Sequence, residues 1–92
     1  MNKIQAQLNA FAKKGGKPSR RRYVKRVRQL INFCKIHFGV RNEGQIGRAQ
    51  LLAWYAEQPR GKPLAPTTLR DRGYAADLLW ELLDRGNKAP RL

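Results

Sequence analysis

The sequence predicts an all-α protein, a compact bundle of four helices. Apolar residues recur at the spacing of a helix in four stretches, and clusters of glycine and proline separate those stretches. No stretch alternates apolar and polar residues as a strand with one buried face would. With 92 residues, of which 41% are hydrophobic, the chain can bury one core and is too short for a second of useful size.

The first predicted helix is short and covers residues 4–14. Ile4, Leu8 and Phe11 follow the i, i+4, i+7 spacing of one helical face, and alanines between them favour the helix. The run Gly15-Gly16-Lys17-Pro18 cannot continue it, because glycine and proline both break helices. We therefore expect a Gly-Gly hinge between this helix and the rest of the chain.

The second predicted helix covers residues 20–38 and has the clearest apolar face. Ser19 can cap its start with the side-chain oxygen, and Gly39 can end it in the left-handed backbone conformation. Its apolar stripe consists of Tyr23, Val24, Val27, Leu30, Ile31, Cys34 and Phe38.

The remaining predicted helices cover residues 48–58 and a stretch that ends near Arg85. A loop precedes each of them, at residues 40–47 and at the proline-rich residues 59–66. The last helix has a choice of two capping hydroxyls, which are Thr67 and Thr68. Within its apolar stripe, Gly73 would let a neighbouring helix approach closely.

The charge of the chain indicates an anionic partner. Twenty Lys and Arg residues against 6 Asp and Glu residues give a formal net charge of +14. Residues 1–42 contain 12 of those cations and no acid, whereas residues 43–92 contain the other 8 and all 6 acids. Such an excess repels itself unless an anion neutralises it, and nucleic acid is the first candidate.

Residues suited to catalysis or metal binding are scarce. Cys34 is the only cysteine and His37 the only histidine, so neither a disulfide within the chain nor a cysteine-based zinc site can form. The acids of the last helix alternate with arginines, which is typical of a solvated face; they are Asp71, Asp77, Glu81 and Asp84. We predict no enzyme, no metal and no cofactor.

The sequence also lacks an apolar run long enough to span a membrane and an N-terminal secretory signal. We expect a cytoplasmic, nucleoid-associated protein with no membrane partner. Binding to a membrane surface or to RNA is a weaker alternative, because the apolar helix face is needed for the core and no sheet bears stacking aromatics.

Two clusters are candidates for binding nucleic acid. The first surrounds the start of the second helix, where the cations lie outside the apolar stripe and are expected to share one surface: Lys17, Ser19, Arg20, Arg21, Arg22, Lys25, Arg26, Arg28 and, further on, Lys35. The second combines the proline-rich loop with the start of the last helix: Arg60, Lys62, Thr67, Thr68, Arg70, Arg72 and Tyr74. The alternatives are a merely solubilising face for the first cluster and, for the second, helix capping by the threonines and an Arg72 stem stretched over the core.

Phe33 and Ile36 are unexpected on the second helix, since both project from the side opposite its apolar stripe. One interpretation is that the first helix folds back over the hinge and covers them with Ile4, Leu8 and Phe11. The other is that they form a docking surface for a partner protein.

The order of the segments resembles a known family. The quoted elements are Ser19-Arg20-Arg21-Arg22-Tyr23 leading into a helix, Gln45-Ile46 before the third helix, and Leu64-Ala65-Pro66-Thr67-Thr68-Leu69 opening the last. Over residues 19–90 they resemble the N-terminal core-binding domain of tyrosine recombinases (phage-type integrases), a SAM-like bundle of four or five helices.

This resemblance implies a role in DNA recombination and integration. The family uses the domain to clamp duplex DNA opposite a separate catalytic domain, so it implies DNA contacts from Thr67, Thr68, Arg70 and residues 20–28. Two features depart from the family. Three arginines stand where it often has a threonine, and the catalytic domain with its nucleophilic tyrosine is missing, so this chain could bind DNA but not recombine it.

We therefore predict an N-terminal arm with hinge at residues 1–18 and a helical DNA-binding domain at residues 19–92. The expected partner is double-stranded DNA, held mainly through phosphates, with a recombinase catalytic domain or another protein as a further partner. The alternative is an adaptor, or a small nucleoid or regulatory protein, that docks a partner through Phe33, Ile36 and the first helix.

Overall fold

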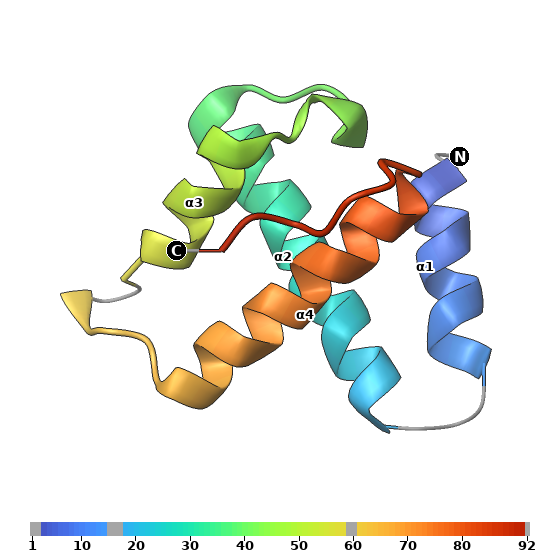
Figure 1. The fold of residues 1–92 in the computed structure, drawn as a ribbon, viewed down its shortest axis with the longest axis horizontal. Helices are drawn as coiled ribbons and strands as arrows, with labels where there is room; N and C mark the ends of the chain where they lie inside the picture. The colour runs from blue at the N-terminus through green and yellow to red at the C-terminus, as the bar shows by residue number, and fades with distance from the viewer. Residues whose placement is uncertain (1–2, 15–17, 59–60, 92) are drawn as a thin grey trace.

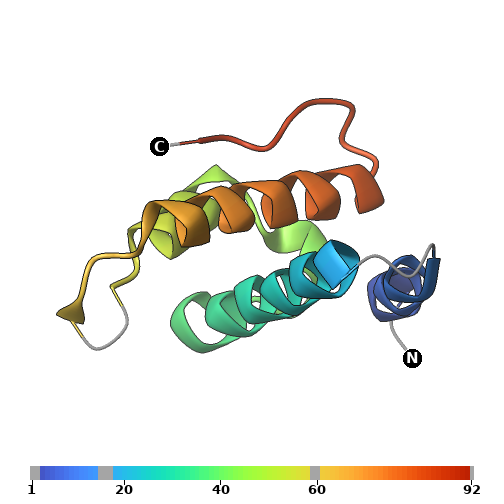
Figure 2. The same ribbon diagram turned by 90° about the horizontal axis from the view of Figure 1, so that it is seen from below.

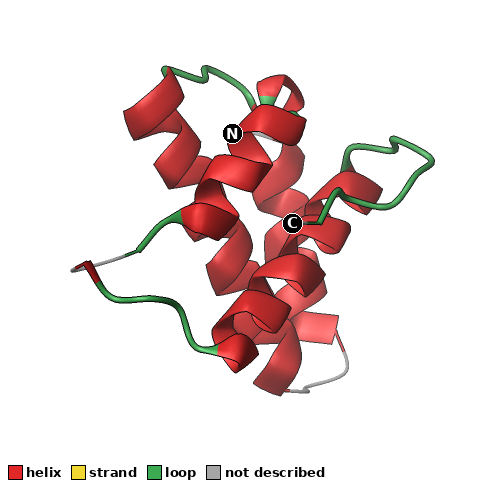
Figure 3. Ribbon diagram, turned by 60° about the vertical axis from the view of Figure 1, so that its left-hand side comes forward, coloured by secondary structure: helices red, strands yellow, loops and turns green. Residues whose placement is uncertain are grey.

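The computed structural model describes residues 3–14, 18–58 and 61–91. These ranges contain four α-helices and the short 3-10 helix η2, and no strand occurs in them (Figure 3). The elements are α1 (Lys3–Lys13), α2 (Pro18–Phe38), η2 (Glu43–Gln45), α3 (Arg48–Ala56) and α4 (Pro66–Leu82). The predicted all-α bundle of four helices is confirmed.

The two longest helices, α2 and α4, cross at the centre of the molecule, and α1 and α3 lie on either side of the crossing (Figure 1). Seen from below, α4 lies over α2, with α1 beyond the N-terminal end of α2 (Figure 2). In Figure 1 the N-terminal ends of α2 and α4 both lie at the lower edge of the molecule. In Figure 2 these two starts lie apart, with α4 beginning on the left and α2 on the right, so the helices approach each other where they cross.

One hydrophobic core holds the helices together. Leu8 of α1, Val27 and Leu30 of α2, and Leu79 of α4 have no exposed surface, and Trp54 of α3 has 1%. Burying each such side chain contributes about 1.5–3 kcal/mol. Because Leu8 belongs to this core, α1 packs against the rest of the bundle.

The lone cysteine is part of the same core. Cys34 is fully buried and makes no disulfide. Burial raises the pKa of its thiol to about 11, because the thiolate would lose its hydration. The side chain therefore acts as a small apolar group in this fold.

Two predicted helix caps are wrong, and prolines are the reason. Helix α2 already begins at Pro18 and α4 at Pro66, with Ala65 as a cap residue that makes no side-chain hydrogen bond. Proline suits the first helical position, since its fixed φ is helical and the amide hydrogen it lacks would have no partner there. Ser19, Thr67 and Thr68 consequently lie within first turns, where the sequence predicted caps.

The helix ends differ from the predictions by a few residues. Gly39 ends α2 with φ 65°, as predicted. Helix α3 ends at Ala56 rather than at residue 58, and the predicted loop before it contains η2. Helix α4 stops at Leu82 rather than near Arg85, because Asp84 takes a left-handed conformation with φ 56°.

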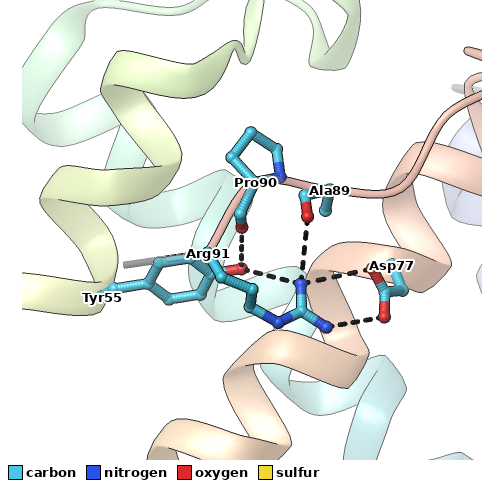
Figure 4. Close-up of polar contacts among 5 residues, drawn as sticks. All are labelled: Tyr55, Asp77, Ala89, Pro90 and Arg91. Carbon is cyan, nitrogen blue, oxygen red and sulfur yellow. Dashed lines mark hydrogen bonds and ion pairs between the residues drawn. The ribbon is translucent and has the colours of Figure 1, made fainter.

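The residues after α4, here called the C-terminal strap (residues 83–91), run back across α4 to α3 (Figure 1). The Tyr55 hydroxyl donates a hydrogen bond to the Pro90 carbonyl oxygen at 3.0 Å, and Arg91 Nη2 lies 2.7 Å from Asp77 Oδ2 (Figure 4). A Cβ at Gly73 would lie 2.9 Å from Arg91 Nε. Gly73 thus admits an arginine of the strap, where a neighbouring helix was expected.

The predicted hinge residues Gly15, Gly16 and Lys17 lie outside the described residues, and the division at residue 18 stays a prediction. Among the described residues, no helix is both long and apolar enough to span a membrane.

Candidate nucleic-acid interface

The cations of α2 lie on two flanks of that helix. On the flank that faces α1, Arg21, Lys25 and Arg28 line an open groove of about 550 Å³, together with Val24 and with Ala12 of α1. Arg28 donates hydrogen bonds to Gln5 and Asn9 of α1. The guanidinium is therefore held at the groove, although it remains exposed. We call this cationic groove the α1–α2 groove.

On the other flank, α2 meets the start of α4. Arg22 Nε lies 3.0 Å from Asp71 Oδ2, and the Arg22 guanidinium lies 5.5 Å from the centre of the Tyr23 ring. Tyr23 in turn meets Tyr74 edge to face, with 5.7 Å between ring centroids. These contacts join the two clusters that the sequence predicted separately.

The exposed face of α4 continues from this junction. Thr67, Arg70 and Tyr74 are exposed and follow the i, i+3, i+7 spacing of one helical face. Thr67 lies in the first turn of α4, where free backbone N–H groups and the positive end of the helix dipole attract anions. The α4 start is thus chemically suited to phosphate.

The first turn of α2 has similar chemistry. It contains no acid, and Arg20, Arg21 and Arg22 follow Ser19 there. The Arg20 guanidinium lies 4.7 Å from the centre of the Phe11 ring, a cation–π contact that ties it to α1. Arg21 and Arg22 remain exposed, whereas Ser19 and Arg20 are half-buried.

Several predicted site residues lie elsewhere. Arg26 is half-buried on the side of α2 that faces α3, where its Nη1 donates to Gln29 at 3.1 Å. The cations of α2 therefore divide between two flanks, whereas one shared surface was predicted. Lys62 is exposed in the loop before α4, and Thr68 is half-buried; Lys17 and Arg60 lie outside the described residues.

Arg72 is a structural arginine, although it belonged to the second predicted cluster. Only 4% of its surface is exposed. Its guanidinium lies 4.7 Å from the centre of the Trp54 ring, donates a hydrogen bond to the Trp54 carbonyl oxygen and pairs with Glu57 at 3.0 Å. Burial lowers the pKa of Arg72, and the bond to Glu57 opposes that shift. No phosphate could reach this group without displacing α3.

Helix α1 does not cover Phe33 and Ile36, contrary to the first of the two interpretations. Ile36 is 69% exposed, and Phe33 is half-buried with its ring 4.4 Å from that of His37. Helix α1 packs on the opposite flank, where Arg28 meets Gln5. The uncovered pair lines a groove of about 380 Å³, the α2–α3 groove, formed by Arg26, Gln29, Asn32, Phe33, Ile36, His37, Trp54, Glu57 and Arg72.

The acids of α4 behave mostly as a charge-mixed face. Asp71 pairs with Arg22, and Asp77 with Arg91. Within the part of the chain that the structure describes, no group of three or more His, Cys, Asp or Glu side chains could hold a metal ion.

Comparison with known proteins found no matching family model, no similar curated protein and no similar solved structure.

Proposed function

We propose that this chain binds double-stranded DNA, mainly through phosphates. The observation that supports it best is the junction of α2 and α4. There the Arg22–Asp71 and Tyr23–Tyr74 contacts connect the cations around the α1–α2 groove with the exposed face of α4. We call the combined patch the α2/α4 surface: Arg20, Arg21, Arg22, Tyr23, Lys25, Arg28, Lys62, Thr67, Arg70 and Tyr74.

The α2/α4 surface offers the three kinds of donor that phosphate oxygens accept. Arginine forks bind phosphate in a bidentate way, as Arg21 and Arg70 can, because both are exposed and neither forms an ion pair with another described residue. Thr67 adds a hydroxyl, and the first turns of both helices add backbone N–H groups. Contacts of this type set position and affinity and carry no sequence information.

The size of the molecule fits a short footprint on DNA. Its longest dimension is 35 Å, which corresponds to about one turn of duplex DNA. Within such a turn a cationic face can reach phosphates on both sides of a groove. We therefore propose that the domain contacts about one turn of duplex DNA and does not wrap the duplex around itself.

The proposal extends to a role in DNA recombination or integration, as a non-catalytic part similar to an integrase core-binding domain. The order of the segments supports this extension, and a recombinase catalytic domain would then be its partner. A DNA-bound protein of this kind would be associated with the nucleoid. The assigned role is binding, and no catalytic step is part of it.

Matched charge reversals test the proposal. Arg21→Glu/Lys25→Glu changes the α2/α4 surface, whereas Arg41→Glu/Arg48→Glu changes two exposed cations beyond the other end of α2 by the same total charge. We expect the first pair to weaken binding to a random duplex by more than about tenfold, and the second pair to weaken it much less. Fluorescence anisotropy at fixed salt measures both.

A third variant tests the junction itself. Asp71 is the acid at the α2/α4 surface that pairs with Arg22. Asp71→Asn is expected to tighten duplex binding severalfold, because it removes a negative charge and frees the Arg22 guanidinium for phosphate.

The two charge-reversal pairs also show what would contradict the proposal. If Arg21→Glu/Lys25→Glu and Arg41→Glu/Arg48→Glu weaken duplex binding equally, net charge alone attracts DNA, and the assignment of the α2/α4 surface is wrong.

A further inference from the structure

The α2–α3 groove is not explained by the proposed DNA binding. None of Arg21, Lys25, Arg28, Thr67, Arg70 and Tyr74 lines it. It combines an exposed apolar part with buried charge. These two properties together indicate what kind of partner would fit.

The apolar part consists of Ile36, Phe33 and Trp54. Ile36 is 69% exposed in the last turn of α2, one turn after the half-buried Phe33. Trp54 lines the groove from α3 and is itself 1% exposed. Covering Ile36 and Phe33 with an apolar side chain would remove apolar area from water, which favours binding.

The charged part has more cations than acids. Arg26 and Arg72 line the groove together with a single carboxylate, Glu57, and that carboxylate pairs with Arg72. Arg26 is left without an acid in the groove lining. The positive charge of Arg26 also acts on Arg72, lowering its pKa, although burial lowers that pKa more.

Both guanidinium groups have an unused donor. The Nε atoms of Arg26 and Arg72 are buried and have no hydrogen-bond partner. A buried donor without a partner is unfavourable, so a carboxylate that drew these groups into a hydrogen-bonded arrangement would relieve part of that cost. The groove thus lacks one negative charge and its acceptor oxygens.

We propose that the α2–α3 groove docks a short acidic and apolar peptide segment of a partner protein. An apolar side chain of the segment packs on Ile36 and Phe33, and a neighbouring carboxylate pairs with Arg26. A second copy of this chain is a poor occupant, because two molecules with a net charge of +14 repel each other. DNA is also a poor occupant, because the apolar side chains of Ile36 and Phe33 offer phosphate oxygens no donors.

The first test uses a short peptide of alternating glutamate and leucine as the probe, titrated into the full chain and followed by NMR. We expect shift changes centred on the Ile36 methyl groups and the Trp54 indole. Two control peptides, with glutamine in place of glutamate and serine in place of leucine, should bind about tenfold more weakly. Failure of the first peptide to shift these signals, or equal binding of the serine peptide, would overturn the proposal.

Variants locate the site without disturbing the core. Ile36→Ser should abolish the peptide shifts, and Arg26→Gln should remove the preference for glutamate over glutamine. Lys35→Gln is the matched control, since it removes an exposed cation of the same helix outside the groove lining. If Lys35→Gln weakens binding as much as Arg26→Gln does, the peptide is attracted by overall charge and the groove is not its site.

The DNA proposal can fail or hold independently of this one. Arg21→Glu/Lys25→Glu should lose duplex binding and keep the peptide shifts at Ile36 and Trp54. A random duplex titrated into the wild-type chain should leave those two signals unchanged. Strong shifts there with duplex and none with peptide would assign the groove to DNA and contradict the proposed peptide partner.

Discussion

Arg72 connects α3 to α4, and its removal should be costly. Its guanidinium caps the C-terminal part of α3 through the Trp54 carbonyl and stacks on the Trp54 ring. Arg72→Met keeps most of the apolar stem but loses the hydrogen bond to Trp54 and the ion pair with Glu57. The Glu57 carboxylate is 33% exposed, so water can solvate it once its partner is removed. We expect the free energy of unfolding to fall by about 2 kcal/mol, measured by urea unfolding followed by tryptophan fluorescence.

The conservative change Arg72→Lys separates geometry from charge. Lysine keeps the charge but lacks the planar fork and the stacking, so it should recover less than half of the loss. Duplex affinity of both variants, measured well below their unfolding transitions, should stay near the wild-type value because Arg72 is 4% exposed. If these variants lost most of their affinity for duplex while their free energy of unfolding stayed unchanged, Arg72 would belong to the DNA-binding surface after all.

Burial of Arg72 was one of two interpretations that the sequence left open, and the spacing of this residue favours it. Arg72 precedes Ala75, Ala76 and Leu79 by three, four and seven residues, which puts it on the apolar face of its helix. Its partner Glu57 could not have been identified, because their pairing depends on how α3 packs on α4. Sequence spacing indicates which face of a helix a residue occupies, and the neighbouring helix decides what that face contacts.

At the scale of elements, the C-terminal strap should be energetically coupled to Gly73. Alanine is about 1 kcal/mol more favourable than glycine within a helix, but a Cβ at Gly73 would displace the Arg91 side chain. Gly73→Ala should therefore give little or no stabilisation in the wild-type chain and about 1 kcal/mol in the Arg91→Ala background. Urea unfolding of the four proteins of this cycle measures the coupling; additive effects would show that the strap does not restrict this position.

The helices were predictable from the sequence because each has an apolar period, and their ends were less so. Prolines that begin α2 and α4 replaced the predicted hydroxyl caps, and Asp84 ended α4 early. The C-terminal strap has no repeating apolar spacing from which its position could be predicted. Its position depends on contacts such as that between Tyr55 and Pro90, which are 35 residues apart. The junction between α2 and α4 was missed for the same reason, since Arg22 and Asp71 meet only after the helices cross.

At the scale of the whole molecule, the excess of positive charge should appear as a strong salt dependence of duplex binding. The described cations of the α2/α4 surface are Arg20, Arg21, Arg22, Lys25, Arg28, Lys62 and Arg70. If all of them contact phosphates, the logarithm of the binding constant should fall with the logarithm of salt concentration with a slope of about −6. The measured slope should be somewhat shallower than this, because Arg22 already pairs with Asp71 and Arg20 already stacks on Phe11.

Single substitutions should change this slope in steps. Lys62→Gln removes an exposed cation and should reduce the magnitude of the slope by about 1, with a similar loss of affinity on every duplex sequence. Arg48→Gln, which removes an exposed cation from the start of α3, should leave the slope unchanged. Anisotropy titrations between low and physiological salt measure both, and a wild-type slope near zero would contradict phosphate binding by this surface, whatever the net charge of the chain.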